Sequence, residues 1–283
     1  MDLSVIIVNY NTRELLKKCL ESAFLSKTAF AFEVIVSDNG SKDASLEMVN
    51  TEFPQVKIIA NGANLGFSKG NNVAIRQAAG EYILLLNSDT TVREDTFDLS
   101  VNYAKTHPEV GALGCKVLLP SGQLDKACRR KFPNPWNSFL RLFGLKKFSD
   151  YNIDLPIDQE TEVDAVMGAY MLVPKKVVEK VGMLSEDYFM YGEDLDWCWR
   201  IKKAGYKIVY YPKASITHFK YGSSKLVPFK TIRLAHNAMK IFYKKHYSEN
   251  YPQAFNWLVV LGIDLRMFLV LAVNLIRKNK SVH

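Results

Sequence analysis

The chain has 283 residues, which is enough for one large domain with an appendage or for two smaller domains. Hydrophobic residues make up 48% of it, so a sizeable core is expected and wholesale disorder is excluded. The formal net charge of +8 suits a phosphorylated small molecule, anionic lipid or nucleic acid as a partner, and the charge alone does not choose among them.

The cysteines and the N-terminus point to a reducing compartment. The cysteines are scattered, without the paired spacing of a zinc site or a redox motif. The N-terminus runs straight into an apolar segment and lacks the basic start and cleavage site of a signal peptide, so we expect a cytoplasmic protein. The four cysteines are Cys19, Cys115, Cys128 and Cys198.

Apolar runs alternate with helical patterns over the first 90 residues. This alternation predicts a mainly parallel α/β sheet flanked by helices. Ligands of such sheets bind beyond the carboxyl ends of the strands, so Asp38, Asn64 and Asp89 are expected on one rim. Strands are predicted at residues 3–8, 32–37, 56–60 and 82–86, and helices at 13–25, 43–52 and 66–79.

The middle of the chain has a looser pattern, from residue 110 to 211. Residues 123–158 mix basic, aromatic and proline residues, which predicts a long surface loop or lid. Residues 163–173 are apolar around Gly168. A helix is predicted at 193–204 and a strand at 208–211.

Polar clusters follow the second and third predicted strands. Asp38 can accept hydrogen bonds from a base or a ribose, and the alternative is a turn that caps the next helix. Residues 61–72 are rich in glycine and asparagine, so backbone amides at a helix N-terminus can approach an anion. The segment has no Walker motif, and the first turn lacks the dinucleotide fingerprint, which disfavours an ATPase or an NAD enzyme.

The fourth predicted strand ends in Asn87-Ser88-Asp89. A carboxylate here can hold a divalent cation that bridges two phosphates, because Mg²⁺ takes one or two protein carboxylates and completes its shell with phosphate and water. The alternative is a cap for a helix at 91–95. His218, beyond the last predicted strand, is a second candidate metal ligand, with a purely structural histidine as the alternative.

Three carboxylates open the predicted helix at 193–204. Asp196 and Arg200 are four residues apart and can form an ion pair on one helical face. Asp194 has no such partner in sequence, so it is the freer candidate for a general base. Gly192 permits a turn that would let Glu193 and Asp194 leave the helix start and face a cleft.

The predicted lid carries Arg129, Arg130 and Lys131 among aromatic and proline residues. Guanidinium groups bind phosphates in a bidentate manner. We therefore expect this loop to contact a diphosphate, either that of a donor or that of a lipid-linked acceptor. The alternative is a basic loop that faces only water.

The C-terminal region differs in character from the rest. A helix pattern at 229–246 carries basic residues opposite an apolar side, and residues 257–276 form an apolar stretch that is long enough to cross a bilayer, which takes about 20 residues. Asp264 and Arg266 near its centre would each cost roughly 2.5–3.5 kcal/mol on insertion. The basic residues are Lys230, Arg233, Lys240, Lys244 and Lys245, with a tail of Arg277, Lys278 and Lys280.

These features favour helices that lie in the membrane interface, with the basic residues on anionic headgroups. A spanning helix and soluble packing are the alternatives. Because the basic residues cluster with a long apolar stretch, a lipid surface is favoured over nucleic acid.

Taken in order, the motifs resemble the family 2 inverting glycosyltransferases of the GT-A fold, over roughly residues 3–222. Within that family the chain is similar to bacterial rhamnosyltransferase-like enzymes of polysaccharide assembly. The segments that carry the resemblance are Val5-Ile6-Ile7-Val8-Asn9-Tyr10-Asn11, Asn64-x-Gly66-Phe67, Asn87-Ser88-Asp89, Leu124-Asp125-x-x-Cys128-Arg129-Arg130-x-Phe132-Pro133 and Gly192-Glu193-Asp194-x-Asp196.

The resemblance implies roles for single residues. Many relatives have Asp at the position of Asn87, and its loss removes one charge from the implied metal site. By resemblance, Asn9 and Asp38 contact the nucleoside, Asn64 and Gly66 line the donor site, Asp89 binds the metal and Asp194 is the base. Beside the resemblance, we expect His218 to share the metal, Glu193 to support the base, and Arg129, Arg130 and Gly168 to lie on the acceptor or phosphate side.

The expected function is inverting transfer of a sugar from a nucleoside diphosphate to an acceptor hydroxyl, with Mg²⁺ or Mn²⁺ as cofactor. A single displacement needs no enzymic nucleophile, and no such motif is evident. Rhamnose is the candidate sugar, dTDP-rhamnose the candidate donor, and a lipid-linked glycan of cell-surface polysaccharide synthesis the expected acceptor. The alternatives are a catalytically impaired, membrane-associated sugar-nucleotide binding protein and a nucleotidyltransferase, although the latter would want a Gly- and Lys-rich loop after the first strand.

The resemblance also sets the expected organisation. Residues 1–222 form the GT-A domain, with a nucleotide-binding half at 1–115 and an acceptor half at 116–222, and residues 223–283 form the helical membrane-associating region. The protein is expected on the inner face of the plasma membrane, as a peripheral protein. A homodimer is left open.

Overall fold

The computed structural model describes residues 1–134, 151, 153–220 and 228–276. Eleven strands and eight α-helices occur in this part of the chain. The strands are β1 (Leu3–Asn9), β2 (Phe32–Asp38), β3 (Lys57–Ala60), β4 (Tyr82–Leu86), β5 (Thr90–Val92), β6 (Val110–Leu118), β7 (Arg129–Arg130), β8 (Thr161–Glu162), β9 (Ala165–Val166), β10 (Tyr170–Pro174) and β11 (Lys207–His218). The helices are α1 (Arg13–Phe24), α2 (Ser45–Glu52), α3 (Gly66–Ile75), α4 (Thr96–Thr106), α6 (Lys175–Val181), α7 (Glu193–Lys203), α8 (Pro228–His246) and α9 (Gln253–Ile276), with 3-10 turns at Lys126–Cys128 and Ser248–Asn250.

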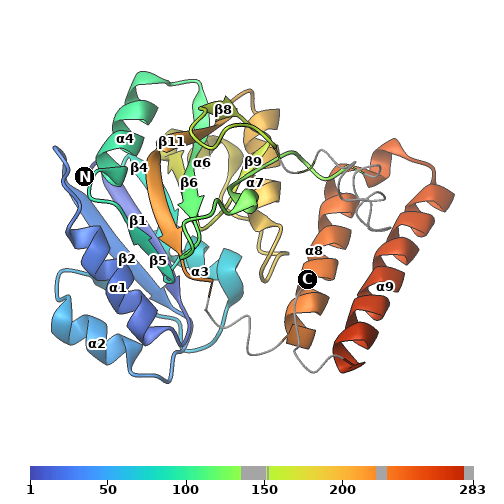
Figure 1. Ribbon diagram of the computed structural model, residues 1–283, viewed down its shortest axis with the longest axis horizontal. Helices are drawn as coiled ribbons and strands as arrows, with labels where there is room; N and C mark the ends of the chain where they lie inside the picture. Colours follow the sequence, from blue (N-terminus) through green and yellow to red (C-terminus); the bar gives the residue numbers. More distant parts are fainter. Residues whose placement is uncertain (135–150, 152, 221–227, 277–283) are drawn as a thin grey trace.

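A mixed sheet forms the centre of the molecule, with helices packed against it (Figure 1). Its strand order is β3-β2-β1-β4-β10-β6-β11-β5, and β8 pairs with β11 beside this path. The pairs β1–β2, β2–β3, β1–β4 and β6–β11 are parallel, whereas β10 runs antiparallel to both β4 and β6. The predicted α/β class with a mainly parallel sheet is therefore confirmed.

The parallel strands are apolar because both faces of the sheet are covered. In β1, for example, Leu3, Val5, Ile6 and Ile7 are completely buried. Parallel sheets that are covered on both sides read as continuous hydrophobic runs, which is why these strands were visible in the sequence. The register of β1 and β2 places their last residues, Asn9 and Asp38, side by side at the carboxyl edge.

Of the two longest strands, β6 was absent from the sequence prediction and β11 was predicted too short. β6 contains Gly111 and Gly114, which lower its strand propensity. A Cβ at Gly111 would lie 2.5 Å from the Tyr206 side chain, and one at Gly114 would lie 2.5 Å from Val166. The glycines therefore allow neighbouring elements to approach the strand closely. β11 runs to His218, well past residue 211, because a register shift between Tyr211 and Ser215 lets it continue.

The alternative of a helix at residues 91–95 is wrong. After Asp89 the chain forms β5, which pairs antiparallel with the end of β11, and α4 begins only at Thr96. Residues 90–92 are Thr-Thr-Val, and such β-branched side chains favour strands. Asp89 therefore lies in a tight connection between two strands and caps no helix.

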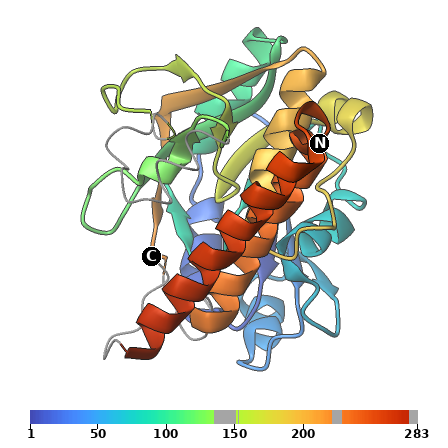
Figure 2. The same ribbon diagram turned by 90° about the vertical axis from the view of Figure 1, so that its right-hand side faces the viewer.

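The C-terminal helices α8 and α9 form a hairpin at one side of the sheet domain (Figure 1). The buried side chains of Ala238 and Phe242 of α8 pack with Tyr188, which precedes α7. Figure 2 shows that α9 covers the outside of α8 and is the outermost layer on this side. Among the described residues, α9 is the one helix that is long and apolar enough to cross a membrane. The basic tail at 277–280 lies outside the described residues.

Candidate active site

The ends of β1 and β2 hold the two residues implied to contact a nucleoside. Asn9 donates from Nδ2 to Asp38 Oδ1 at 2.8 Å and to Ser41 Oγ at 3.0 Å. Asp38 Oδ2 accepts from the backbone N–H of Ser41 at 2.8 Å. Asn9 and Asp38 are both completely buried, so the pair is fixed by its own hydrogen bonds. Each carboxylate oxygen of Asp38 still has a lone pair for a ligand hydroxyl or a base N–H.

The loop from Asn64 to Gly66 is built around one close contact. Gly66 has a φ of +81°, and a Cβ there would lie 2.3 Å from the carbonyl oxygen of Phe189. The same carbonyl accepts from the N–H of Phe67 at 2.7 Å. Asn64 Oδ1 accepts from the N–H of Gly66 at 3.0 Å, and Asn39 donates to the carbonyl of Gly66 at the same distance. The loop after β3 is therefore tied to the segment that leads into α7.

Asp89 and His218 meet, although they are 129 residues apart in the chain. His218 Nε2 lies 3.0 Å from Asp89 Oδ1, and the two side chains are 9% and 13% exposed. Asn87 Nδ2 lies 3.5 Å from the same ring nitrogen. The sheet explains the meeting, because Asp89 directly precedes β5, whose first residue Thr90 pairs with His218 at the end of β11.

The other side of His218 faces Asp125. His218 Nδ1 is buried and has no hydrogen-bond partner among the described residues, and it lies 4.0 Å from Asp125 Oδ2. That oxygen forms an ion pair of 2.7 Å with Lys220 Nζ. Asp125 belongs to the lid motif and was not assigned a site role from the sequence. Asp125 and His218 are far apart in the sequence, so no local pattern indicated that they are neighbours.

The donor set of Asp89 and His218 fits a divalent cation that is shared with a substrate. One carboxylate and one imidazole are acceptable ligands for Mg²⁺ or Mn²⁺. The described residues contain no group of three or more His, Cys, Asp or Glu side chains that could enclose a metal. A cation held by this pair would take its remaining ligands from phosphate and water, as Mg²⁺ does in nucleotide sites.

Asp194 is held by two groups that come from distant parts of the chain. Its Oδ2 accepts from Arg130 Nη2 at 2.7 Å and from the N–H of Gly168 at 3.2 Å. Its Oδ1 accepts from the N–H of Leu195 at 2.8 Å. The expectation that Asp194 is free of a charged partner is therefore wrong, because the fold supplies Arg130 from 64 residues away.

The Arg130 side chain is held in place by this contact and by a second hydrogen bond. It is buried in β7 and also donates to the carbonyl of Val166 at 2.9 Å. Burial alone would lower the pKa of the Arg130 guanidinium, but the charge of Asp194 raises it above its usual value. Arg130 therefore stays charged, and its hydrogen bond fixes the position of Asp194.

Glu193 precedes Asp194 and has the opposite environment. Burial, together with the charge of Asp194, raises the pKa of Glu193 to about 8. Its Oε2 is buried and has no hydrogen-bond partner among the described residues. At pH 7 this carboxyl group is therefore mostly protonated, whereas Asp194 beside it is paired with a cation. Both residues lie in the first turn of α7, so neither leaves the helix as Gly192 had suggested.

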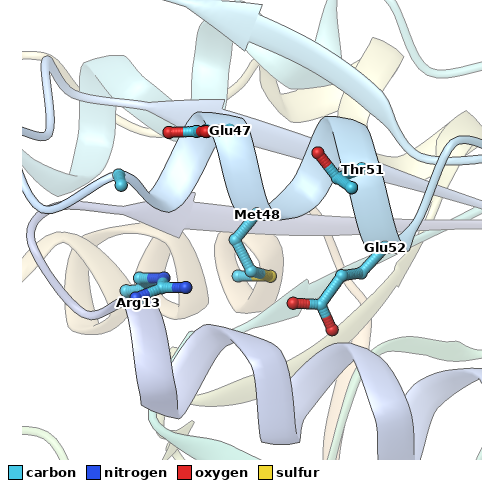
Figure 3. Close-up of a pocket in the computed structure, with 6 residues that line it drawn as sticks. Arg13, Glu47, Met48, Thr51 and Glu52 are labelled. Atoms are coloured by element: carbon cyan, nitrogen blue, oxygen red, sulfur yellow. The ribbon is translucent and has the colours of Figure 1, made fainter.

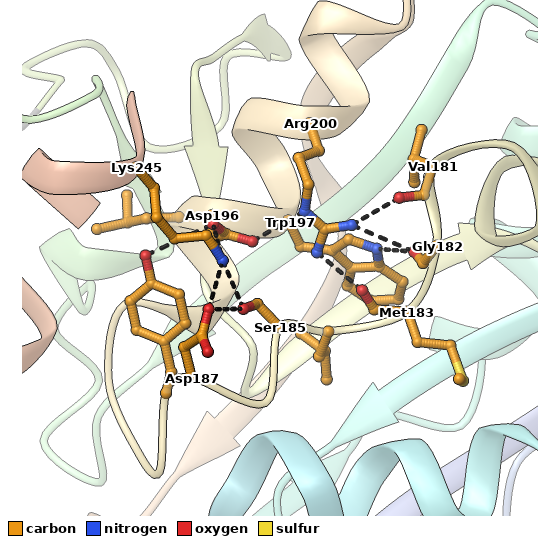
Figure 4. Close-up of polar contacts among 12 residues, drawn as sticks. Val181, Gly182, Met183, Ser185, Asp187, Asp196, Trp197, Arg200 and Lys245 are labelled. Carbon is orange, nitrogen blue, oxygen red and sulfur yellow. Dashed lines mark hydrogen bonds and ion pairs between the residues drawn. The ribbon is translucent and has the colours of Figure 1, made fainter. Parts of the chain in front are cut away.

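Asp196 is completely buried at the centre of a polar network (Figure 4). The predicted ion pair with Arg200 forms at 2.9 Å. His246 of α8 adds a contact of 2.9 Å from its Nε2 to Asp196 Oδ1. Burial alone would raise the pKa of Asp196, but the hydrogen bond with His246 and the charge of Arg200 lower it.

The same network joins three parts of the chain. Arg200 donates to the carbonyls of Val181 and Met183 at 2.7 and 2.8 Å. Lys245 of α8 donates to Asp187 Oδ2 at 2.9 Å (Figure 4). The helix that carries Asp194 is therefore oriented by the segment before it and by α8. Spacing predicted only the Asp196–Arg200 pair, since His246 follows 50 residues later.

Arg129 points into the protein rather than toward a ligand. Its guanidinium donates to the carbonyl oxygens of Leu155 and Pro156 and lies 4.9 Å from the centre of the Tyr210 ring. These contacts give Arg129 a structural role in joining both ends of the predicted lid. The Nε–H of Arg129 is buried and has no hydrogen-bond partner among the described residues. Most of that lid, residues 135–150 and 152, lies outside the described residues.

A groove of about 380 Å³ lies between α1 and α2 (Figure 3). It contains none of the predicted site residues, and most of its lining side chains come from these two helices. We therefore place the candidate site at the strand ends and not in this groove. Its lining residues are Arg13, Ala44, Glu47, Met48, Thr51 and Glu52.

Two hydroxyl groups join the strand ends into one rim. Thr12 Oγ1 donates to Asn9 Oδ1 at 2.6 Å and lies 2.9 Å from Ser88 Oγ. The loop after β1 is thereby linked to the loop after β4. Both residues follow strands directly, and that position is the one sequence signal that could have identified them.

Residues 2–235 match the model of the family described as "Glycosyltransferase like family 2". The chain belongs to glycosyltransferase family 2. It is 27% identical over 305 residues to the N-acetylglucosaminyl-diphospho-decaprenol L-rhamnosyltransferase of Mycobacterium tuberculosis, covering 98% of this chain and 95% of that one. It is 28% identical over 237 residues to the rhamnosyltransferase WbbL of Escherichia coli, covering 81% and 88%.

A solved structure supports the same fold. The mannosyltransferase PcManGT of Pyrobaculum calidifontis, in complex with GDP-Man and Mn²⁺, superposes with a TM-score of 0.60 at 16% identity, covering 95% of this chain and 75% of that chain. The resemblance to GT-A enzymes of family 2 is thus confirmed, as is the similarity to bacterial rhamnosyltransferases. The chain is a glycosyltransferase, and its apolar α9 fits a membrane-associated protein.

Proposed function

We propose that this glycosyltransferase moves rhamnose from dTDP-rhamnose to a hydroxyl of a lipid-linked glycan, with inversion at the anomeric carbon. The observations that carry the proposal are the Asn9–Asp38 and Asp89–His218 pairs at the strand ends, together with the buried Asp194, which Arg130 and Gly168 hold in place. The rhamnosyltransferase relatives, one of which is named for a diphospho-decaprenol acceptor, support the sugar and the acceptor class.

The donor side uses residues that are already fixed. Asp38 accepts hydrogen bonds from the base or ribose, and Asn9 holds its carboxylate in place at 2.8 Å. Asn64 and Gly66 form the wall of the donor site next to Phe189. Asp89 and His218 would hold a divalent cation, Mg²⁺ or Mn²⁺, which would supply positive charge for the leaving diphosphate. With Asn87 in place of a second carboxylate, such a cation would depend more on the phosphates of the donor.

The acceptor side centres on Asp194, the proposed general base. Its Oδ2 already accepts two hydrogen bonds, from Arg130 and Gly168, whereas Oδ1 accepts one from Leu195. Oδ1 therefore has the free lone pair and takes the proton of the acceptor hydroxyl. The hydroxyl oxygen attacks the anomeric carbon as the bond from that carbon to the diphosphate oxygen breaks, and this single displacement inverts the configuration.

Arg130 and Gly168 act as positioning groups on this side of the site. Both hold Asp194 by direct hydrogen bonds, and Glu193 lies beside it as a neutral carboxyl group at pH 7. We assign residues 1–222 to the catalytic domain, with halves at 1–115 and 116–222, and residues 223–283 to the membrane-associating region. A cytoplasmic donor and a lipid-linked acceptor meet at the inner face of the plasma membrane, where we place the protein.

The test is a transfer assay with purified protein, anionic vesicles and a polyprenyl-diphosphate-linked N-acetylglucosamine. With dTDP-rhamnose and Mg²⁺ or Mn²⁺ we expect a rhamnosylated lipid whose anomeric configuration, read by NMR, is opposite to that of the donor. Transfer from UDP-GlcNAc or GDP-mannose instead would refute the choice of sugar. Donor binding without transfer or hydrolysis would favour the catalytically impaired binding protein, for which Asn87 is the supporting feature. Formation of a nucleotide–sugar bond would show a nucleotidyltransferase.

A further inference from the structure

Helix α9 has its polar and apolar faces reversed relative to a helix on the surface of a water-soluble domain. The three cross-hairpin contacts join Tyr243 Oη to Asn256 Oδ1 at 2.7 Å, Lys240 Nζ to Asp264 Oδ1 at 2.8 Å, and Arg266 Nη1 to His236 Nε2 at 3.1 Å. Asn256, Asp264 and Arg266 of α9 therefore all contact α8. A surface helix normally directs its polar face at water.

His236, on the α8 side of these contacts, can accept a hydrogen bond from Arg266. His236 Nδ1 lies 2.7 Å from the carbonyl of Ile232, so this nitrogen carries the proton and Nε2 accepts from Arg266. Burial, aided by the charge of Arg266, lowers the pKa of His236 and keeps the ring neutral. Both charged residues of α9, Asp264 and Arg266, thus have partners on α8.

The outward face of α9 is apolar over its full length. Trp257 is 72% exposed and Phe268 is 71% exposed. Since Asp264 and Arg266 are the only charged residues of α9, and both turn toward α8, this face carries no charge. In water it would be a large exposed apolar patch, which monomeric soluble proteins rarely have. The exposed large side chains are Phe255, Trp257, Leu258, Val260, Leu261, Leu265, Phe268, Leu269, Val273, Leu275 and Ile276.

The charge of the hairpin identifies what covers this face. α8 carries exposed basic residues beside it, and a second copy of the same hairpin would bring these like charges together. Anionic lipid headgroups complement them. The exposed basic residues of α8 that lie outside the Asp196 network are Lys230, Arg233 and Lys244.

We propose that the α8–α9 hairpin lies in the plane of the bilayer, with the outward face of α9 inserted among the acyl chains and without crossing the membrane. This inference names the surface that meets the lipid, and it rests on the proposed function only for the presence of a lipid-linked acceptor. The helix has 24 residues and is about 36 Å long. In this orientation its outward face forms a continuous apolar strip along the membrane.

The contacts with α8 argue against crossing. A spanning α9 would separate Asp264 from Lys240 and Arg266 from His236, and would carry both charges into the hydrocarbon core. α8 cannot follow, because Phe242 and His246 bind it to the catalytic domain at Tyr188 and Asp196. A helix that lies in the plane keeps every one of these contacts.

The depth of single labels tests the proposal. The four native cysteines are buried, so one cysteine placed at Leu258, Leu265 or Leu275 can be labelled with the fluorophore NBD in the full chain. In vesicles that contain phosphatidylglycerol, we expect all three labels to enter at one shallow depth and to be reduced by dithionite added outside. The matched control is Leu25→Cys, just after the end of α1; Leu25 is 66% exposed on the catalytic domain, so its label should stay in water.

Two outcomes would overturn it. A label at residue 265 at the bilayer centre, with labels 258 and 275 reached from opposite sides, would show a spanning helix. Labels that stay in water with lipid, together with self-association of the full chain by light scattering, would show that a second copy covers α9. Neither readout uses substrate, so it is independent of whether the proposed donor is correct.

A second measurement uses charge on the same face. The triple variant Leu261→Glu/Leu265→Glu/Phe268→Glu changes exposed side chains only, so its thermal unfolding should match that of the wild type. We expect its partition onto the same vesicles to fall by roughly tenfold or more, since insertion scales with the apolar area that is buried. Leu25→Glu should bind as the wild type does. Equal binding of the triple variant would overturn the proposal.

Discussion

Substituting Glu193 by Gln should stabilise the protein, and the gain should grow with pH. The carboxyl group of Glu193 is buried without a hydrogen-bond partner for Oε2 among the described residues, and burial raises its pKa from 4.5 to about 8. Gln has almost the same shape and stays neutral at every pH. The variant therefore removes the cost of ionising a buried acid beside Asp194 and leaves the packing unchanged.

The size of the effect follows from linkage. Below pH 4.5 the carboxyl is protonated in both the folded and the unfolded chain, so the two proteins should be equally stable. Between pH 4.5 and 8, the Glu193 carboxyl of the wild type ionises in the unfolded chain but stays protonated in the folded chain. The free energy of unfolding of the wild type therefore falls by about 1.4 kcal/mol per pH unit. The variant is spared this loss, which amounts to about 3 kcal/mol at pH 7 and at most about 5 kcal/mol above pH 8.

Urea unfolding, followed by tryptophan fluorescence at several pH values across this window, measures the difference directly. Glu47→Gln is the matched control, because Glu47 is exposed on α2 and its replacement should change stability little at any pH. If the Glu193→Gln difference is the same at pH 5 and pH 8, or if the variant is less stable, then Glu193 is not a neutral buried acid and the reasoning fails.

Three further predictions concern the site. Asp194→Asn should lower kcat by about 10²–10⁴-fold with unchanged affinity for the nucleotide, and Glu193→Gln should lower it less; near-normal turnover of the Asp194 variant would move the base elsewhere. Asp89→Ala should abolish activity and the stabilisation of the donor complex by Mn²⁺ in thermal unfolding, while the fold survives; full wild-type activity in excess chelator would contradict this. Asp196→Ala should reduce the free energy of unfolding by about 3–5 kcal/mol, because it leaves Arg200 and His246 without their buried counter-charge; a loss under about 1 kcal/mol in urea unfolding would show that the network is not needed.

The rim of the site could be predicted because it depends on local rules. Parallel strands align their carboxyl ends, so Asn9, Asp38 and Asp89 had to lie near one another once the strands were recognised. The ion pair of Asp196 and Arg200 follows in the same way from helical spacing. These inferences need only the period of the pattern and the direction of the strands.

The contacts that hold the proposed base could not be predicted. Arg130 reaches Asp194 across 64 residues, and His246 reaches Asp196 across 50, so no periodic pattern links them. β6 was missed because Gly111 and Gly114, which serve close packing against Tyr206 and Val166, weaken its strand signal. For α9, hydropathy gave the length, but only the contacts show that Asp264 and Arg266 turn inward.

The contact between His246 and Asp196 limits how this enzyme can be dissected. A chain shortened before α8 would lose its lipid-binding surface. The buried Asp196 of α7 would also lose its hydrogen bond with His246 and the nearby ammonium group of Lys245. Such a fragment, although more soluble, would be a poor reference for the activity of the whole protein. Solubility is better sought by placing charges on the outer side of α9, which leaves the link between the two regions intact.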